Sequence, residues 1–119
     1  MRIAIIGTGY VGLVSGACFS EFGIEVVCVD KQKAKIDALN NNEIPIYEPE
    51  LGSLVAKNVK AGRLSFSTNL GKAVQDSDSV FIAVGTPSRR GDGHADLTFV
   101  YDAAHEIAHA ITDYTVVVT

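Results

Sequence analysis

Cysteine is scarce in this sequence of 119 residues, and the two that occur, Cys18 and Cys28, form no C-x-x-C pair. Pairs with that spacing are typical of zinc sites and of redox motifs, so the sequence indicates neither. We therefore expect two free thiols, both buried as small apolar groups, in a protein of the reducing cytoplasm.

Long apolar runs and an excess of positive charge are also missing. No run approaches the roughly 20 residues that span a bilayer, so we expect no membrane partner. The opening "MRIAIIG" lacks the small-residue cleavage site of a signal peptide and has the pattern of a β-strand. The formal net charge of −4 leaves no basic patch, so we expect no nucleic-acid partner.

No internal repeat, low-complexity tract or linker divides the chain, which fits a single domain. Short apolar runs alternate with segments of helical spacing, and most runs are almost continuously apolar, as strands buried on both faces are. This alternation predicts an α/β fold, a Rossmann-type doubly wound parallel sheet of about five strands with helices on both faces. The expected strands are residues 3–6, 25–29, 64–66, 80–84 and 115–119.

The helical segments carry apolar stripes that we expect to face the sheet. Asn69 is the expected N-cap of a short helix that contains "LGKAV". The first helix has a stripe of Val11, Val14, Cys18 and Phe22. The last has a stripe of Val100, Ala103, Ala104, Ile107, Ala108 and Ile111.

The chain stops at Thr119, on the fifth expected strand, with no turn or helix after it. A sheet that ended there would leave apolar surface uncovered. We therefore expect residues 1–119 to be an incomplete domain, truncated after strand five of a longer protein, and to self-associate near that strand as a homo-oligomer.

A glycine-rich loop, "GTGYVG", follows the first strand and precedes the first helix. Gly7 would allow a tight turn, Gly9 would let a pyrophosphate approach the backbone, and Gly12 would let the helix pack closely. The loop contains no Lys or Arg, so the N–H groups and dipole of the helix would attract the anion. The missing G-K-[ST] argues against a nucleotide-hydrolysing P-loop.

Asp30 ends the second expected strand, where a carboxylate can accept hydrogen bonds from the ribose hydroxyls of an adenosine. A carboxylate there would repel a 2′-phosphate, which favours NAD over NADP, although Lys31, Lys33 or Lys35 could partly offset that repulsion. The alternative for Asp30 is a helix N-cap alone. Similar strand-loop-strand units also occur in methyltransferases and in ligand-sensing domains.

The segment after the fourth strand, "VGTP", is expected at the same edge of the sheet. The alternative is a simple turn that ends the strand. If it lines the same cleft, its contributions are the open backbone of Gly85, the hydroxyl of Thr86, and the neighbouring Val84 and Pro87.

The whole chain resembles the amino-terminal part of the nucleotide-sugar 6-dehydrogenases, the UDP-glucose/GDP-mannose 6-dehydrogenase family, and most of all its UDP-glucose-oxidising members. The stretches that carry the resemblance are "GTGYVGLVSGACFSEFG", "VVCVDKQKAKIDALN", "IPIYEPEL", "GRLSFSTN", "VFIAVGTPS" and "DGHADLTFVYDAAHEIA". The resemblance implies an NAD-dependent oxidation of a sugar C6 alcohol to a carboxylate through two hydride transfers and a thiohemiacetal on a cysteine.

The family's motifs imply particular roles here. Asp30 would bind the adenosine ribose, with Lys35 near it. The catalytic cysteine and its neighbours lie in parts of the family's proteins beyond this chain, and neither Cys18 nor Cys28 sits beside a His or Lys that would activate it. We therefore expect cofactor binding without turnover. The implied pyrophosphate ligands are Gly7, Gly9, Tyr10, Val11 and Gly12, and Val84, Gly85, Thr86 and Pro87 would line the cleft.

Two alternatives remain: within the same class, a GDP-mannose or UDP-N-acetylmannosamine 6-dehydrogenase, and from another class, a nucleotide-sensing module without chemistry. One departure from the family is Glu50, which stands where the family has glycine in E-P-G-L. We expect that glycine not to be required, because Pro49 and Glu50 suit the first turn of a helix. "IPIYEPE" is expected to be a rigid packing loop, with a ligand role for Tyr47 or Glu48 as the alternative.

Residues 105–109 read "HEIAH" and match the H-E-x-x-H motif of zinc proteases. Each histidine follows a residue of the apolar stripe, and little chain remains for a third ligand or a cleft. We therefore expect surface histidines and no metal. Arg89 and Arg90 are expected to be solvated rather than phosphate-binding.

Overall fold

The computed structural model of the chain describes residues 1–89 and 91–119. Five strands form one sheet in the order β3-β2-β1-β4-β5, and every neighbouring pair is parallel. The expected α/β fold with a Rossmann-type sheet is thus confirmed. The strands are β1 (Arg2–Ile6), β2 (Glu25–Val29), β3 (Leu64–Ser67), β4 (Ser79–Ile82) and β5 (Val116–Val118).

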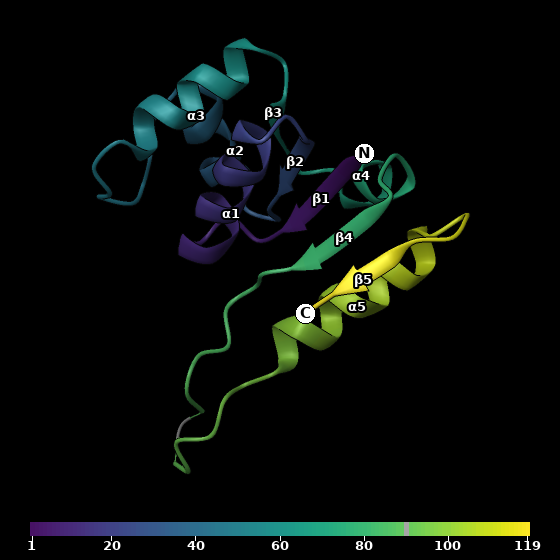
Figure 1. Ribbon diagram of the computed structural model, residues 1–119. Helices are drawn as coiled ribbons and strands as arrows, with labels where there is room; N and C mark the ends of the chain where they lie inside the picture. Colours follow the sequence, from purple (N-terminus) through teal and green to yellow (C-terminus); the bar gives the residue numbers. More distant parts are fainter. Residues whose placement is uncertain (90) are drawn as a thin grey trace.

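The helices cover both faces of the sheet (Figure 1). Helices α1, α2 and α3 share one buried apolar cluster with the sheet, and α4 and α5 share the other. Within the described ranges, no helix combines the length and the hydropathy needed to cross a membrane. The helices are α1 (Tyr10–Glu21), α2 (Lys33–Asn40), α3 (Leu51–Lys60), α4 (Leu70–Gln75) and α5 (Thr98–Ala110).

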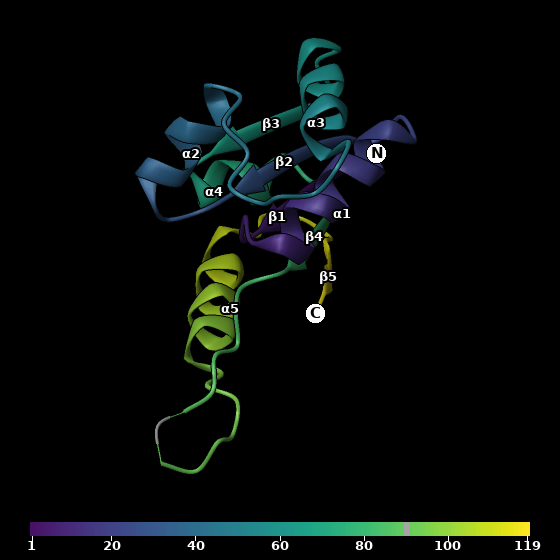
Figure 2. The same cartoon turned by 90° about the vertical axis from the view of Figure 1, so that its left-hand side faces the viewer.

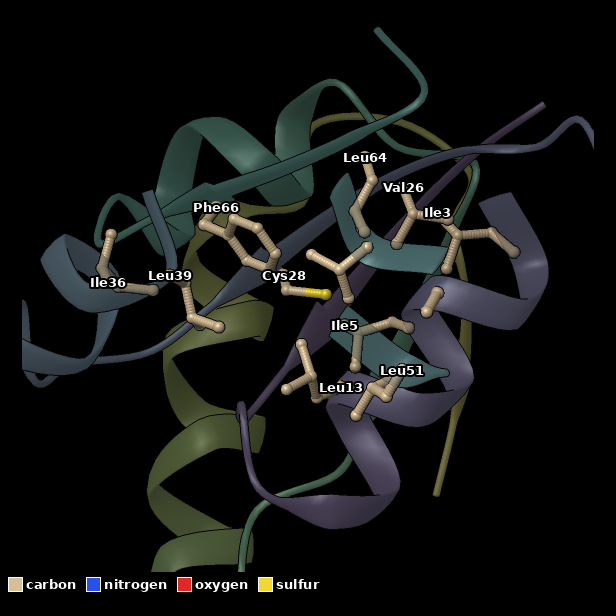
Figure 3. Close-up of a cluster of buried hydrophobic side chains, with 12 residues drawn as sticks. Ile3, Ile5, Leu13, Val26, Cys28, Ile36, Leu39, Leu51, Leu64 and Phe66 are labelled. Atoms are coloured by element: carbon tan, nitrogen blue, oxygen red, sulfur yellow. The ribbon is translucent and has the colours of Figure 1, made fainter. Parts of the chain in front are cut away.

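Successive residues of the central strands alternate between the two clusters. Ile3 and Ile5 of β1 point into the cluster drawn in Figure 3, whereas Ala4 and Ile6 belong to the cluster on the opposite face. Strands covered on both sides can be apolar at every position, which explains the continuous runs. At about 25 cal/mol per Å², this burial is the main force that holds the helices on the sheet.

The edge strand β5 is an exception. Val116 and Val117 are each 42% exposed, so burial on both faces is wrong for this strand. Its one neighbour in the described sheet is β4, which leaves its other edge open.

The orientation expected for α1 is also wrong. Val11 is 65% exposed, Phe22 is 83% exposed and Cys18 is exposed, so these three positions face outward and only Cys28 is a buried thiol, whereas Val14 packs against the buried cluster as expected. A Cβ atom on Gly16 would lie 2.7 Å from the Cys28 sulfur, so at this position α1 lies too close to the sheet for a side chain. The buried positions are Gly12, Leu13, Gly16, Ala17 and Ser20.

The other helix predictions are confirmed in part. The side chain of Asn69 accepts a hydrogen bond of 3.1 Å from the Lys72 N–H and caps α4, as expected. In α5, Ala103 and Ile107 are buried as expected. Ala104 and Ala108 are exposed instead, and Ala110, which was not expected in the stripe, is buried.

The segment between β4 and α5 extends away from the sheet, at the bottom of Figures 1 and 2. Its two arms meet in an antiparallel bridge between Ser88 and Ala95, supported by a hydrogen bond of 2.7 Å from the Asp96 N–H to the Pro87 carbonyl. Arg89 pairs with Asp92 at 2.5 Å, whereas Arg90 lies outside the described residues.

The loop before α3 contains a strained residue. Glu50 has φ 76° and ψ −16°, which is the left-handed region that favours glycine. The expectation that glycine is not required here was therefore wrong. In the same loop, Ile44 and Ile46 pack against the core, as a packing loop should, whereas Tyr47 is 97% exposed.

Replacing Glu50 with glycine should therefore stabilise the chain. A non-glycine residue in the left-handed region costs roughly 1–2 kcal/mol, and glycine gives back part of this gain through its freer unfolded chain. We expect Glu50→Gly to raise the free energy of unfolding by about 0.5–1 kcal/mol in urea denaturation. The control is Asn42→Gly at φ 61°, where asparagine already tolerates this conformation and a smaller gain is expected. An equal gain in the free energy of unfolding in both variants, or no gain in Glu50→Gly, would contradict the conclusion that the backbone is strained at Glu50.

Candidate functional site

The carboxyl ends of β1, β2 and β4 open into a cavity of about 740 Å³. It lies where the strand order reverses between β1 and β4, the usual ligand position in such sheets, and its volume falls within the roughly 300–1,000 Å³ of small-molecule sites. Nine of the expected site residues line it: Gly7, Gly9, Tyr10, Val11, Asp30, Lys35, Val84, Gly85 and Thr86. Gly12 and Pro87 do not.

Position 7 requires glycine, because of its backbone conformation and because of the atoms that surround it. Its φ of +113° is one that side chains rarely adopt, and a Cβ there would lie 2.5 Å from the Ala83 carbonyl oxygen. Its N–H donates to the Val29 carbonyl at 2.7 Å. The loop therefore crosses from β1 in direct contact with both neighbouring strands.

Gly9 and Gly12 differ in what surrounds them. A Cβ on Gly12 would lie 2.0 Å from the Gly7 carbonyl oxygen, so this residue sets how closely α1 approaches the loop. A Cβ on Gly9 would meet nothing within 4 Å, and Gly9 lines the cavity. Gly12 thus serves packing, whereas the bare backbone of Gly9 leaves room for a ligand.

The first turn of α1 has free hydrogen-bond donors. Within residues 1–89 and 91–119, the N–H groups of Tyr10, Val11 and Gly12 find no acceptor, and the first helical hydrogen bond is that of Leu13 to the Gly9 carbonyl at 2.9 Å. With the helix dipole, these groups form an anion site that needs no basic side chain.

The carboxylate of Asp30 is held by three donors. Its Oδ2 accepts from the Thr8 hydroxyl at 2.7 Å and from the Thr8 N–H at 3.2 Å, and its Oδ1 accepts from the Gln32 N–H at 2.9 Å. Partial burial alone would raise the pKa of Asp30, but these hydrogen bonds and the charge of Lys35 outweigh it, so the pKa lies below its ordinary value. The group is a stable anion at neutral pH.

The three lysines after Asp30 have different partners. Lys31 pairs with Glu106 of α5 at 2.6 Å, and this pair at the cavity raises the pKa of Lys31. Lys33 pairs with Asp37 at 2.7 Å and lies on the surface of α2. Lys35 lines the cavity, and its positive charge helps to lower the pKa of Asp30.

Several lining residues were missed in the sequence. Phe99, Asp102, Ala103 and Glu106 form one helical face of α5 that borders the cavity, at spacings that the sequence does contain. Thr68 directly follows β3, so the topology alone could have placed it there. Thr8 carried no sequence signal because the G-x-G-x-x-G pattern specifies no residue type at that position.

The histidines of the H-E-x-x-H match and the two cysteines do not line this cavity. His105 and His109 are both exposed, and no group of three or more metal-ligating side chains gathers in the described part of the chain. Burial raises the pKa of the Cys28 thiol to about 12, which suits a packing role. Cys18 is exposed but does not line the cavity.

Comparisons with known proteins agree with this geometry. The model of the UDP-glucose/GDP-mannose dehydrogenase family, NAD binding domain, matches residues 1–119. A UDP-glucose 6-dehydrogenase of Rhizobium meliloti (strain 1021) is 64% identical over 100% of this chain and 27% of its own length. The chain therefore spans about a quarter of that relative.

Two solved structures show the same fold. A ternary complex of GDP-mannose dehydrogenase from Pseudomonas aeruginosa superposes with a TM-score of 0.93 at 46% identity, covering 99% of this chain and 28% of that one. The UDP-N-acetyl-mannosamine dehydrogenase Cap5O from Staphylococcus aureus gives 0.89 at 29% identity, covering 98% and 28%. The same domain thus occurs in proteins named for different nucleotide sugars.

Alanine at two loop glycines should separate binding from folding. Gly9→Ala places its methyl group in open space, so we expect its free energy of unfolding to stay within about 0.5 kcal/mol of that of the parent chain. The affinity for NAD, measured by calorimetry, should fall at least about tenfold. Gly12→Ala forces a clash with backbone and should destabilise by about 1–3 kcal/mol in denaturant.

The matched control is Gly71→Ala in α4, whose Cβ would make only ordinary contact, and it should affect neither NAD affinity nor folding adversely. A Gly9→Ala variant that binds NAD as well as the parent would show that the cofactor does not approach this backbone.

Proposed function

Because the chain belongs to the UDP-glucose/GDP-mannose dehydrogenase family and matches its NAD-binding domain, we propose that it is the NAD-binding part of a UDP-glucose 6-dehydrogenase. The parent protein would oxidise UDP-glucose to UDP-glucuronate in two hydride transfers, as a precursor for polysaccharide synthesis. One observation carries the proposal: a glycine cradle and an ionised carboxylate face the same cavity at the switch point of the sheet.

The residues around the cavity fit NAD. The free N–H groups of Tyr10, Val11 and Gly12 would hold the pyrophosphate against the open backbone of Gly9. Asp30 would accept from the adenosine ribose, and residues 84–86 would line the other half of the cleft. When bound, NAD supplies the acceptor for a hydride from the alcohol carbon.

The charges favour NAD over NADP. Asp30 is ionised, and the carboxylate of Asp102 also borders the cavity, so a 2′-phosphate would enter a negative environment. Lys31 is paired with Glu106 and Lys33 with Asp37, so of the three lysines Lys35 is left to moderate that repulsion.

Residues 1–119 would bind the cofactor without turnover. A catalytic thiol must reach the substrate as a thiolate, and Cys28 is fully buried with a pKa of about 12. Cys18 lies on the outward side of α1 and away from the cavity. The nucleophile would therefore belong to the part of the parent protein that this chain does not span.

The sugar is the finer part of the proposal. The identity of 64% to a UDP-glucose 6-dehydrogenase supports UDP-glucose, against 46% for the GDP-mannose enzyme of known structure. GDP-mannose is therefore the second candidate. We also propose a cytoplasmic homo-oligomer; the two free thiols support the cytoplasm, and the exposed apolar edge strand β5 supports self-association of residues 1–119.

Calorimetry tests the cofactor assignment. We expect residues 1–119 to bind NAD and ADP-ribose with similar affinity and NADP at least about tenfold more weakly, since two like charges would meet at the ribose. Asp30→Ala should weaken NAD binding and narrow the difference between NAD and NADP. Lys33→Ala, which removes a paired surface charge, is the matched control and should change neither. Unchanged NAD affinity in Asp30→Ala would disprove the ribose assignment.

A chimera tests the proposed reaction. Joining residues 1–119 to the remainder of the 64% identical Rhizobium meliloti enzyme should give NADH formation with UDP-glucose. The same chain joined to the remainder of the Pseudomonas aeruginosa GDP-mannose dehydrogenase would show whether sugar choice follows the added part. A folded UDP-glucose chimera that binds NAD but forms no NADH would contradict the assignment of this domain to such an enzyme.

A further inference from the structure

Thr8 is a buried polar residue in the middle of the glycine loop. It is 3% exposed, although it stands between two glycines whose backbone borders the cavity, and it lines that cavity itself. A buried hydroxyl needs a hydrogen-bond partner, so the choice of partner is informative.

The partner of Thr8 differs from those of the other buried hydroxyls. Ser20 donates to the Ala17 carbonyl at 2.9 Å and Ser77 to the Ala73 carbonyl at 2.7 Å, so both satisfy themselves within the local backbone. The Thr8 hydroxyl instead reaches the carboxylate of Asp30, at 2.7 Å, on the neighbouring strand. Hydrogen bonds to a charged acceptor are the stronger kind.

The hydrogen bonds leave Asp30 little freedom. A carboxylate oxygen has two lone pairs, and Oδ2 accepts two hydrogen bonds, both from Thr8. Oδ1 accepts one, from the Gln32 N–H, so its second lone pair is the acceptor position left for a ligand. The orientation of the carboxylate is therefore set before any ribose arrives.

The same contacts join the two halves of the site. The Gly7 N–H donates to the Val29 carbonyl at 2.7 Å, and the next residue holds Asp30, so the phosphate loop and the end of β2 form one connected unit. A shift of the loop would move the carboxylate with it.

We propose that Thr8 is a positioning residue for the adenosine ribose: its hydroxyl orients the Asp30 carboxylate and ties it to the phosphate loop. This inference rests on the proposed function, in which Asp30 binds the ribose. It predicts that the loss of one buried hydroxyl weakens ribose recognition while leaving phosphate recognition intact.

The test compares ADP with 2′,3′-dideoxy-ADP, which has the phosphates and base but no ribose hydroxyls, by calorimetry on residues 1–119. Thr8→Val removes the hydroxyl and keeps the shape and the N–H. It should weaken ADP binding roughly five- to tenfold and leave dideoxy-ADP binding unchanged, since a hydrogen bond to a charged group is lost. Thr8→Ser keeps the donor and should restore ADP affinity. In an Asp30→Ala background, Thr8→Val should have no further effect on ADP.

A second readout follows the proton on Asp30. Removing a donor to the charged form raises the pKa of that carboxyl. As pH falls, NAD affinity should therefore begin to decline at a higher pH in Thr8→Val than in the parent chain, and carbon NMR of the Asp30 carboxyl should show the same shift. If Thr8→Val does not fold, Thr8→Ala removes the hydroxyl with less bulk and serves in its place.

The outcomes separate the two proposals. If the parent chain prefers ADP to dideoxy-ADP but Thr8→Val weakens both equally, Thr8 only shapes the loop and this inference is overturned while the ribose role of Asp30 stands. Unchanged ADP affinity in Thr8→Val overturns it as well. If the parent chain binds both nucleotides equally, the ribose assignment itself is wrong, and the inference is overturned with it.

Discussion

The close approach of α1 to its own preceding loop is the constraint on which the site depends. The space between the Gly7 carbonyl and position 12 does not admit even one methyl group, and the space between position 7 and the Ala83 carbonyl is equally tight. These contacts place the first turn of α1 at the end of the sheet, with its N–H groups turned to the cavity. Where the backbone carries the attraction for an anion, the accuracy of its position replaces the charge of a side chain.

The two sides of the cavity differ in the sign of their charge. In the proposed binding mode, the N-terminus of α1 would attract the diphosphate at one side, while Asp30, with Asp102 on the facing helix, would keep the ribose side negative. An exposed ion pair such as Lys31 with Glu106 contributes little stability, roughly 0–1 kcal/mol, but it determines where the lysine charge lies. The proposed preference for NAD over NADP would thus come from the arrangement of charges at the cofactor cavity, and the identity of the sugar would not affect it.

Much of this arrangement could be predicted from the sequence, because strand burial and loop chemistry leave local patterns. The parallel sheet, the cap at Asn69 and the convergence of the "GTGYVG" loop with Asp30 followed from such patterns. The orientation of α1 did not, because hydrophobicity suggested the stripe with Phe22, whereas the helix buries the face that carries Leu13 and the small residues Gly12, Gly16 and Ala17. The strained φ of Glu50 did have a signal, the family's glycine at that position, which was misinterpreted, whereas the hydrogen bonds of Thr8 were beyond reach because they join two segments distant in the sequence.

The two thiols differ in exposure, so their alkylation can report on the opening of α1. Cys18 is open to solvent on α1, while Cys28 lies against Gly16 with no exposed surface and a high pKa. Alkylating reagents attack thiolates that they can reach, so the folded chain offers them a single point of attachment. A second equivalent of label can enter only when α1 separates from the sheet, and its rate of entry therefore measures how often that helix opens.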